Sequence, residues 1–104
     1  MSIRPEARAI VLVVDDKRNM LRLMAKVLRD DARVLTAEGG SEAIRILETE
    51  PIDVVLCDVR MPDVDGLQVL QASKRLRPRS QFILMTAHAS VTSAVDALRL
   101  GAYD

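Results

Sequence analysis

The sequence predicts one α/β domain, in which a parallel β-sheet carries helices on both faces. Short apolar runs, several of them rich in β-branched residues, alternate with longer stretches whose apolar residues recur at helical spacing. Successive parallel strands need right-handed crossovers, and these place the helices on both sides of the sheet. The 104 residues fit a single domain, and 49% hydrophobic residues suffice for a packed core.

The first part of the chain contains two expected strands with a helix between them. Residues 9–14 form a continuous apolar run, which is typical of a strand buried on both faces. A helix is expected over 18–30, and the strand expected over 33–37 is mixed enough in composition to lie at an edge of the sheet. The apolar residues at helical spacing within 18–30 are Met20, Leu23, Met24, Val27 and Leu28.

The middle of the chain repeats the alternation. Ser41 is expected to cap a helix that ends at about Glu50, because the following Pro51 cannot continue it. A third strand is expected over 53–57. The loop expected over 59–66 is indicated by its proline, aspartates and glycine.

The last part of the chain adds a fourth strand between two helices. A helix over about 66–75 is expected to bury Leu67 and Leu70. The fourth strand is expected over 81–85, and a final helix over about 90–99.

Composition argues against several classes of protein. The formal net charge of zero argues against direct nucleic-acid contact, which favours a basic face. No apolar stretch approaches the roughly 20 residues of a membrane span, and residues 1–8 resemble a loose leader more than a signal peptide. The single cysteine, Cys57, leaves no disulfide framework, so we expect a reducing, cytoplasmic setting.

Polar residues stand where three of the expected strands end. Asp15 and Asp16 follow the first strand, Asp58 follows the third, and Thr86 follows the fourth. The carboxyl ends of parallel strands share one edge, where open α/β sheets bind ligands. If the first and third strands are neighbours, their ends lie about 5 Å apart. Any one of these carboxylates alone is more simply a turn cap or a solvated loop residue, but the three together indicate a site.

Three carboxylates that close together would raise each other's pKa unless a cation neutralised them. A hard divalent ion with oxygen ligands fits best, which predicts Mg2+, and the turn at 61–62 can aim the main-chain carbonyl of Arg60 at it. Zinc is not supported, because His88 and Cys57 are the only residues of their types. Neither a phosphate-cradling glycine loop nor a serine nucleophile elbow is present.

Taken together, these motifs resemble the receiver domain of response regulators in two-component signalling. The matching segments are 13–16, 58–66, 85–87 and 101–102, and the resemblance covers residues 9–104. The residues around 85–89 and 101–104 look most like receivers of the enhancer-binding transcription activators.

The resemblance implies a role for each candidate residue. Asp58 would accept a phosphoryl group, and Thr86 would be the switch hydroxyl that bonds to it. Asp16, Asp58 and the main-chain carbonyl of Arg60 would ligate Mg2+ directly, with Asp15 acting partly through water. The donor would be a phosphohistidine on a sensor histidine kinase that docks largely on the helix at 18–30.

The resemblance also implies a flavodoxin-like, doubly wound sheet with the strand order 2-1-3-4. The family's fifth strand, with its lysine, and the fifth helix would lie beyond Asp104, so they are missing from the expected fold. That leaves the fourth strand as an open edge and predicts self-association, such as a homodimer. It also predicts phosphorylation that is slow, unstable or uncoupled from an output.

Two other functions stay open. A protein-interaction module that uses the same fold without phosphate would explain the absent lysine. A magnesium phosphatase would need a catalytic acid two residues beyond its nucleophile, where this chain has Arg60. We expect a signalling domain that regulates a downstream, transcriptional output, and not a stand-alone enzyme.

Overall fold

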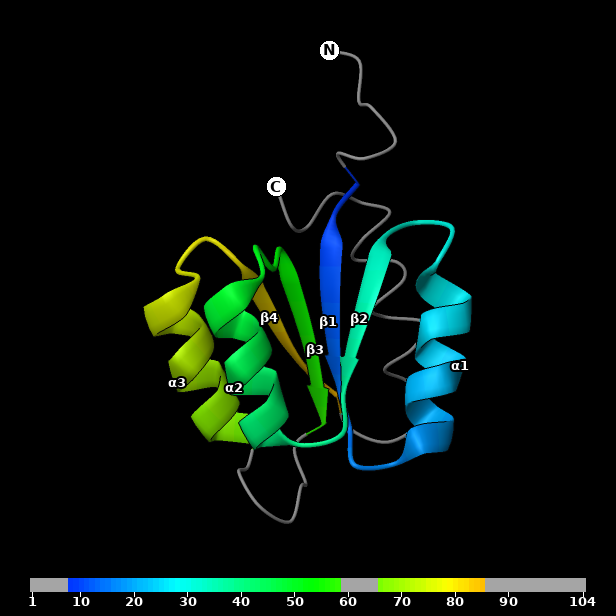
Figure 1. The fold of residues 1–104 in the computed structure, drawn as a ribbon, viewed down its shortest axis with the longest axis horizontal. Coiled ribbons are helices and arrows are strands. Elements are labelled where there is room, and N and C mark those ends of the chain that lie inside the picture. The colour runs from blue at the N-terminus through cyan, green and yellow to red at the C-terminus, as the bar shows by residue number, and fades with distance from the viewer. Residues whose placement is uncertain (1–7, 59–65, 86–104) are drawn as a thin grey trace.

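The computed structural model describes residues 8–58 and 66–85, and it confirms the predicted α/β fold (Figure 1). Four parallel strands form one sheet in the order β2-β1-β3-β4, as expected. The strands are β1 (Ile10–Val14), β2 (Arg33–Ala37), β3 (Val54–Asp58) and β4 (Gln81–Met85). The helices are α1 (Arg18–Leu28), α2 (Gly40–Thr49) and α3 (Gly66–Leu76).

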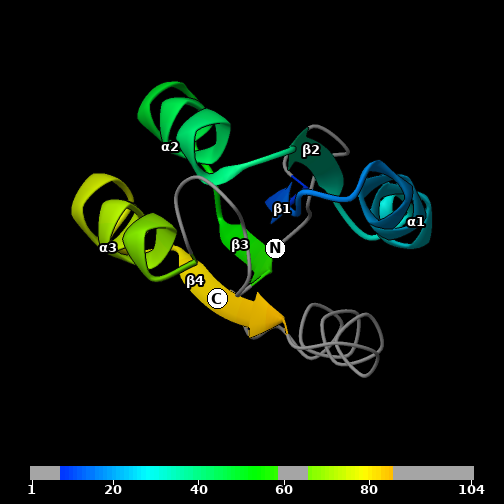
Figure 2. The same ribbon diagram turned by 90° about the horizontal axis from the view of Figure 1, so that it is seen from below.

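The helices lie on both faces of the sheet and create two apolar layers. Helix α1 covers one face, and α2 and α3 lie side by side on the other (Figure 2). The layer under α1 includes Val11, Val13, Leu21, Met24, Leu28 and Leu56. The layer under α2 and α3 includes Leu12, Val14, Leu47, Val55, Cys57 and Val69. Strands β1 and β3 are therefore apolar at successive positions because both of their faces are covered.

The predicted edge strand is confirmed, since β2 pairs with β1 alone among the described strands. Within the same part of the chain, β4 pairs with β3 alone. The predicted bounds of β2 and β4, 33–37 and 81–85, agree with the structure. Self-association through an open edge stays a prediction.

Several predicted boundaries were wrong. Strand β1 begins at Ile10 and not at residue 9, and α1 ends at Leu28 and not at residue 30. Helix α2 begins at Gly40, with Gly39 as its extended N-cap residue, so Ser41 lies inside the helix and does not cap it. Strand β3 begins at Val54 and includes Asp58. Asp53 lies just before the strand, where its side chain accepts a hydrogen bond from the main-chain N–H of Ile10 at 2.8 Å.

Two helices bury different residues from those expected. In α3, Leu67 is 59% exposed and Leu70 is half-buried, whereas Val69 and Ala72 are buried. In α1, Leu23 is 47% exposed, whereas Leu21 is buried. More apolar residues of α1 fall at helical spacing than can contact the sheet. Spacing alone therefore did not identify which of them are buried.

Several predicted features lie outside the described residues: positions 1–7 of the leader, positions 59–65 of the loop expected over 59–66, the helix at 90–99, and the candidate residues Arg60 and Thr86. The last residue of the expected loop, Gly66, begins α3. None of the helices in the described part combines the length and apolar character needed to cross a bilayer.

Candidate metal centre

The sheet brings three carboxylates together at its carboxyl edge. Strands β1 and β3 are neighbours, and Val14 stands opposite Cys57 in their register. Asp15 follows β1 directly and Asp58 ends β3, so the register places these two residues side by side. One carboxylate oxygen from each of Asp15, Asp16 and Asp58 lies within 4.8 Å of the others.

The three side chains form a gradient from the protein interior to solvent. The exposed fraction of the side chain is 6% for Asp15, 17% for Asp58 and 34% for Asp16. Asp15 forms the floor of the site, and a ligand can approach from the side of Asp16. A partly open cluster of this kind suits an ion that keeps some of its water.

Asp15 makes hydrogen bonds through both its main chain and its side chain. Its N–H donates to the carbonyl oxygen of Ala37 at 3.1 Å, which continues the β1–β2 pairing past the end of β1. Its Oδ1 accepts the main-chain N–H of Lys17 at 2.9 Å. This bond closes a tight turn between β1 and α1, as short aspartate side chains commonly do.

Burial is the largest cause of a raised pKa at Asp15. The hydrogen bond from the N–H of Lys17 and the charge of the lysine lower that pKa, while the charges of Asp58 and Asp16 raise it. The net effect is a pKa above the ordinary value of an aspartate. An ionised Asp15 therefore lowers the stability of the fold, even with the charge of Lys17 nearby.

A fourth charged group, the ammonium of Lys17, lies among the carboxylates. Its Nζ is 3.5 Å from Asp16 Oδ1, 3.6 Å from Asp58 Oδ2 and 3.9 Å from Asp15 Oδ1. The three negative charges, Asp15 foremost, raise the pKa of Lys17, so it is fully charged at neutral pH. Sequence reasoning missed this residue. The available signal was a cation placed directly after two aspartates at the end of a strand.

The residues present fit a divalent ion. Oxygens bound to one Mg2+ lie about 2.1 Å from it, so neighbouring ligands are about 3 Å apart and opposite ones about 4 Å. The mutual separation within 4.8 Å needs only a small inward shift of the side chains. All three donors are carboxylates, the ligand type that Mg2+ prefers. The convergence expected for Asp15, Asp16 and Asp58 is thus present in the structure.

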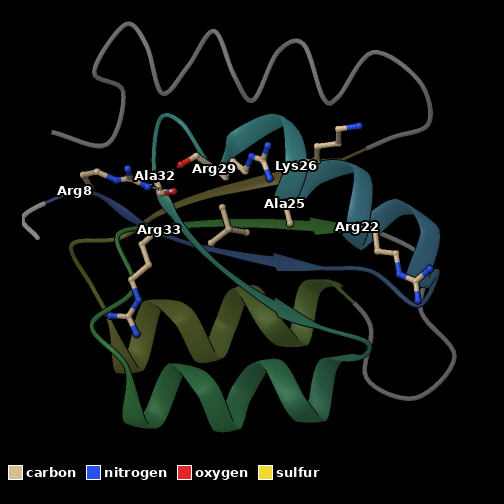
Figure 3. Close-up of a pocket in the computed structure, with 8 residues that line it drawn as sticks. Arg8, Arg22, Ala25, Lys26, Arg29, Ala32 and Arg33 are labelled. Carbon is tan, nitrogen blue, oxygen red and sulfur yellow. Dashed lines mark hydrogen bonds between the residues drawn. The ribbon is translucent and has the colours of Figure 1, made fainter. Parts of the chain in front are cut away.

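A hollow between α1 and the start of β2 is lined by side chains of the opposite charge (Figure 3). Its volume is about 530 Å³, and Arg8 on its wall donates to the main-chain oxygens of Arg29 and Ala32 at 2.7 and 2.9 Å. The described residues that line it include five cations and no carboxylate: Arg8, Arg22, Lys26, Arg29 and Arg33. This hollow therefore offers no carboxylate ligand to a metal ion.

Together, the fold and the carboxylate cluster define a flavodoxin-like α/β domain with three carboxylates, able to hold a cation, at the carboxyl ends of its central strands. The chain belongs to the family of response regulator receiver domains, whose sequence model matches residues 11–104. The resemblance inferred from its motifs is confirmed, and the chain is a receiver domain of the two-component regulators.

The relatives include transcriptional regulators of the enhancer-binding class. The chain is 36% identical to the transcriptional regulatory protein GlrR of Escherichia coli over 104 residues, which is 99% of this chain and 23% of GlrR. It is 38% identical over 98 residues to the DNA-binding transcriptional regulator NtrC of the same species, which is 93% of this chain and 21% of NtrC. The chain thus spans less than a quarter of these relatives.

A solved structure supports the fold independently. The response regulator protein TrrA from Thermotoga maritima, determined in complex with Mg(2+)-BeF, superimposes with a TM-score of 0.71 at 30% sequence identity. The match covers 86% of this chain and 78% of TrrA.

Proposed function

We propose that this domain receives a phosphoryl group from a sensor histidine kinase on the carboxylate of Asp58, with Mg2+ held beside it. The observation that carries the proposal is the position of Asp58. It ends a central strand, and its carboxylate lies within 4.8 Å of those of Asp15 and Asp16 while remaining reachable from solvent. Membership of the receiver family supports the same assignment.

Asp15, Asp16, Asp58 and the main-chain carbonyl of Arg60 would hold the ion. When bound, it would supply positive charge where the negative acceptor meets a negative phosphoryl group. The structure of TrrA in complex with Mg(2+)-BeF supports an ion of this kind in the family.

The reaction we propose is an in-line transfer. An oxygen of the Asp58 carboxylate forms a bond to phosphorus while the bond between phosphorus and the donor imidazole nitrogen breaks, and the electron pair stays on that nitrogen. Such transfers depend on positioning and charge neutralisation more than on covalent help from the protein. Asp58 is well positioned because β3 is paired with β1 and β4 on its two sides. Thr86 would donate its hydroxyl hydrogen to a phosphoryl oxygen.

The test is phosphorylation by a small donor. The full chain is incubated with acetyl phosphate and Mg2+, and intact-mass and peptide mass spectrometry then locate the added group. We expect one phosphoryl group on Asp58, none after Asp58→Asn, and none when EDTA removes the metal. A folded protein that binds Mg2+ but takes no phosphoryl group would contradict the proposal and favour a phosphate-independent interaction module.

The remaining parts of the proposal concern the setting of the domain. We propose that it acts as a cytoplasmic signalling domain with a transcriptional output and not as a stand-alone enzyme, since the relatives that it matches are transcriptional regulators. We also propose self-association. The exposed apolar side chains of Leu23 and Val27 on α1 support it, because exposed apolar surface favours contact with another chain.

A further inference from the structure

We propose that Lys17 is a tethered counter-ion. In the metal-free protein its ammonium occupies the position of the divalent ion among Asp15, Asp16 and Asp58, and metal binding must displace it. Lys17 therefore lowers the affinity of the site for the metal and stabilises the domain when metal is absent. This inference rests on the magnesium site of the proposed function.

The first argument is geometric. The ammonium of Lys17 lies at nearly equal distances, 3.5, 3.6 and 3.9 Å, from one oxygen of each of the three carboxylates. A single group nearly equidistant from all three lies on the central axis of the cluster, and an ion shared by the three carboxylates would lie on the same axis. The next residue does not compete for this position, because Arg18 pairs with Glu38 instead.

The second argument comes from the position of Lys17 in helix α1. Lys17 is the N-cap residue, and its side chain makes no capping hydrogen bond. Asparagine, aspartate and serine are preferred there, and a positive charge at the N-terminus opposes the helix dipole. Local helix chemistry thus disfavours a lysine at this position, whereas the contacts with three carboxylates favour it.

The third argument is that the two cations exclude each other. A Mg2+ ion at about 2.1 Å from the carboxylate oxygens would fill the space between them and repel an ammonium held there. The Lys17 side chain is 66% exposed, so it can swing into solvent without disturbing the core. The hydrogen bond that closes the turn comes from the main-chain N–H of Lys17, and it does not depend on the side chain.

The experiment compares two lysine variants of the full chain. Lys17→Met removes the ammonium and keeps the length of the side chain. Lys26→Met is the matched control, because it makes the same charge change in the same helix but at the basic hollow (Figure 3). Mg2+ is titrated into each protein by calorimetry. We expect about three- to tenfold tighter binding for Lys17→Met, the scale of a few exposed ion pairs, and less than about twofold change for Lys26→Met.

Thermal unfolding gives a second readout that does not depend on phosphorylation. In EDTA, Lys17→Met should unfold at a lower temperature than the wild type, although the loss of a lysine at the N-cap should by itself favour the helix. Saturating Mg2+ should abolish this difference. Any decrease in the unfolding temperature of Lys26→Met should be the same with and without the metal. Lys17→Arg, which keeps the charge, should behave as the wild type in EDTA.

The outcomes separate the two proposals. Equal Mg2+ affinity in the wild type and Lys17→Met overturns the proposal that Lys17 is a counter-ion. An equal gain in Mg2+ affinity in Lys17→Met and Lys26→Met also overturns it, because that result reports only the long-range effect of removing a positive charge. An Lys17→Met protein that is as stable as the wild type in EDTA also overturns it. If Asp16→Ala leaves Mg2+ binding unchanged, the metal site itself is refuted, and the proposed function fails with it.

Discussion

Replacing Asp15 with asparagine should stabilise the metal-free domain at neutral pH. The side chain of Asp15 is only 6% exposed, and burial is the main reason for its raised pKa. An acid whose pKa is higher in the folded state binds protons more tightly there. Above the pKa of the folded state, the ionised carboxylate therefore lowers the free energy of unfolding. This loss of stability disappears when the pH falls below the pKa of the unfolded state. Asparagine removes the charge but keeps an oxygen for the N–H of Lys17.

The expected gain is about 1 kcal/mol, the scale of single stabilising substitutions. For a domain of this size that corresponds to a rise of roughly 4–8 °C in the midpoint of thermal unfolding. The measurement is circular dichroism during heating, in EDTA, at a series of pH values from 7.5 downward. The advantage of Asp15→Asn should shrink as the pH falls through the raised pKa of Asp15 towards the ordinary aspartate value. In saturating Mg2+ the wild type should be the more stable of the two proteins, because the variant lacks one carboxylate ligand.

Two results would refute this reasoning. An Asp15→Asn protein that is less stable than the wild type at neutral pH in EDTA would mean that the ionised carboxylate contributes net stability, through Lys17 and the turn. A gain that is independent of pH would mean that the effect does not come from the charge of Asp15.

Three further predictions follow from burial and from the position of the site. Leu12 is fully buried under α2 and α3, and Leu12→Ala should lower the free energy of unfolding in urea by about 3 kcal/mol. Leu67 lies on the exposed surface of α3, and Leu67→Ala should change that free energy by less than about 0.5 kcal/mol. Comparable losses in the two variants would contradict the burial pattern. Asp16→Ala should weaken Mg2+ binding at least tenfold by calorimetry, as expected when one of three charged ligands is lost. Sedimentation velocity should show a species heavier than the monomer whose fraction increases with protein concentration, and Leu23→Lys should reduce it; a monomer at every concentration would argue against self-association.

The central strands were predictable because their apolar pattern does not depend on which face of the sheet each helix covers. Residues buried on both faces must be apolar at successive positions, as they are in β1 and β3. The mixed composition at 33–37 similarly indicated an edge strand. The buried residues of the helices were harder to predict. An apolar stripe indicates that a helix packs against the sheet, but it does not identify which of its side chains contact the sheet. Leu23 and Leu67 match the helical spacing and still lie exposed.

The sequence by itself determined that carboxylates stand at the ends of apolar strands, and hence that an acidic edge exists. Only the tertiary structure decided how those charges are balanced. The pairing of β1 with β3 brings Asp58 beside Asp15, and the turn into α1 returns the side chain of Lys17 to the same place. Charges interact through space, so an interaction between residues 17 and 58 exists only once the sheet has brought their segments together.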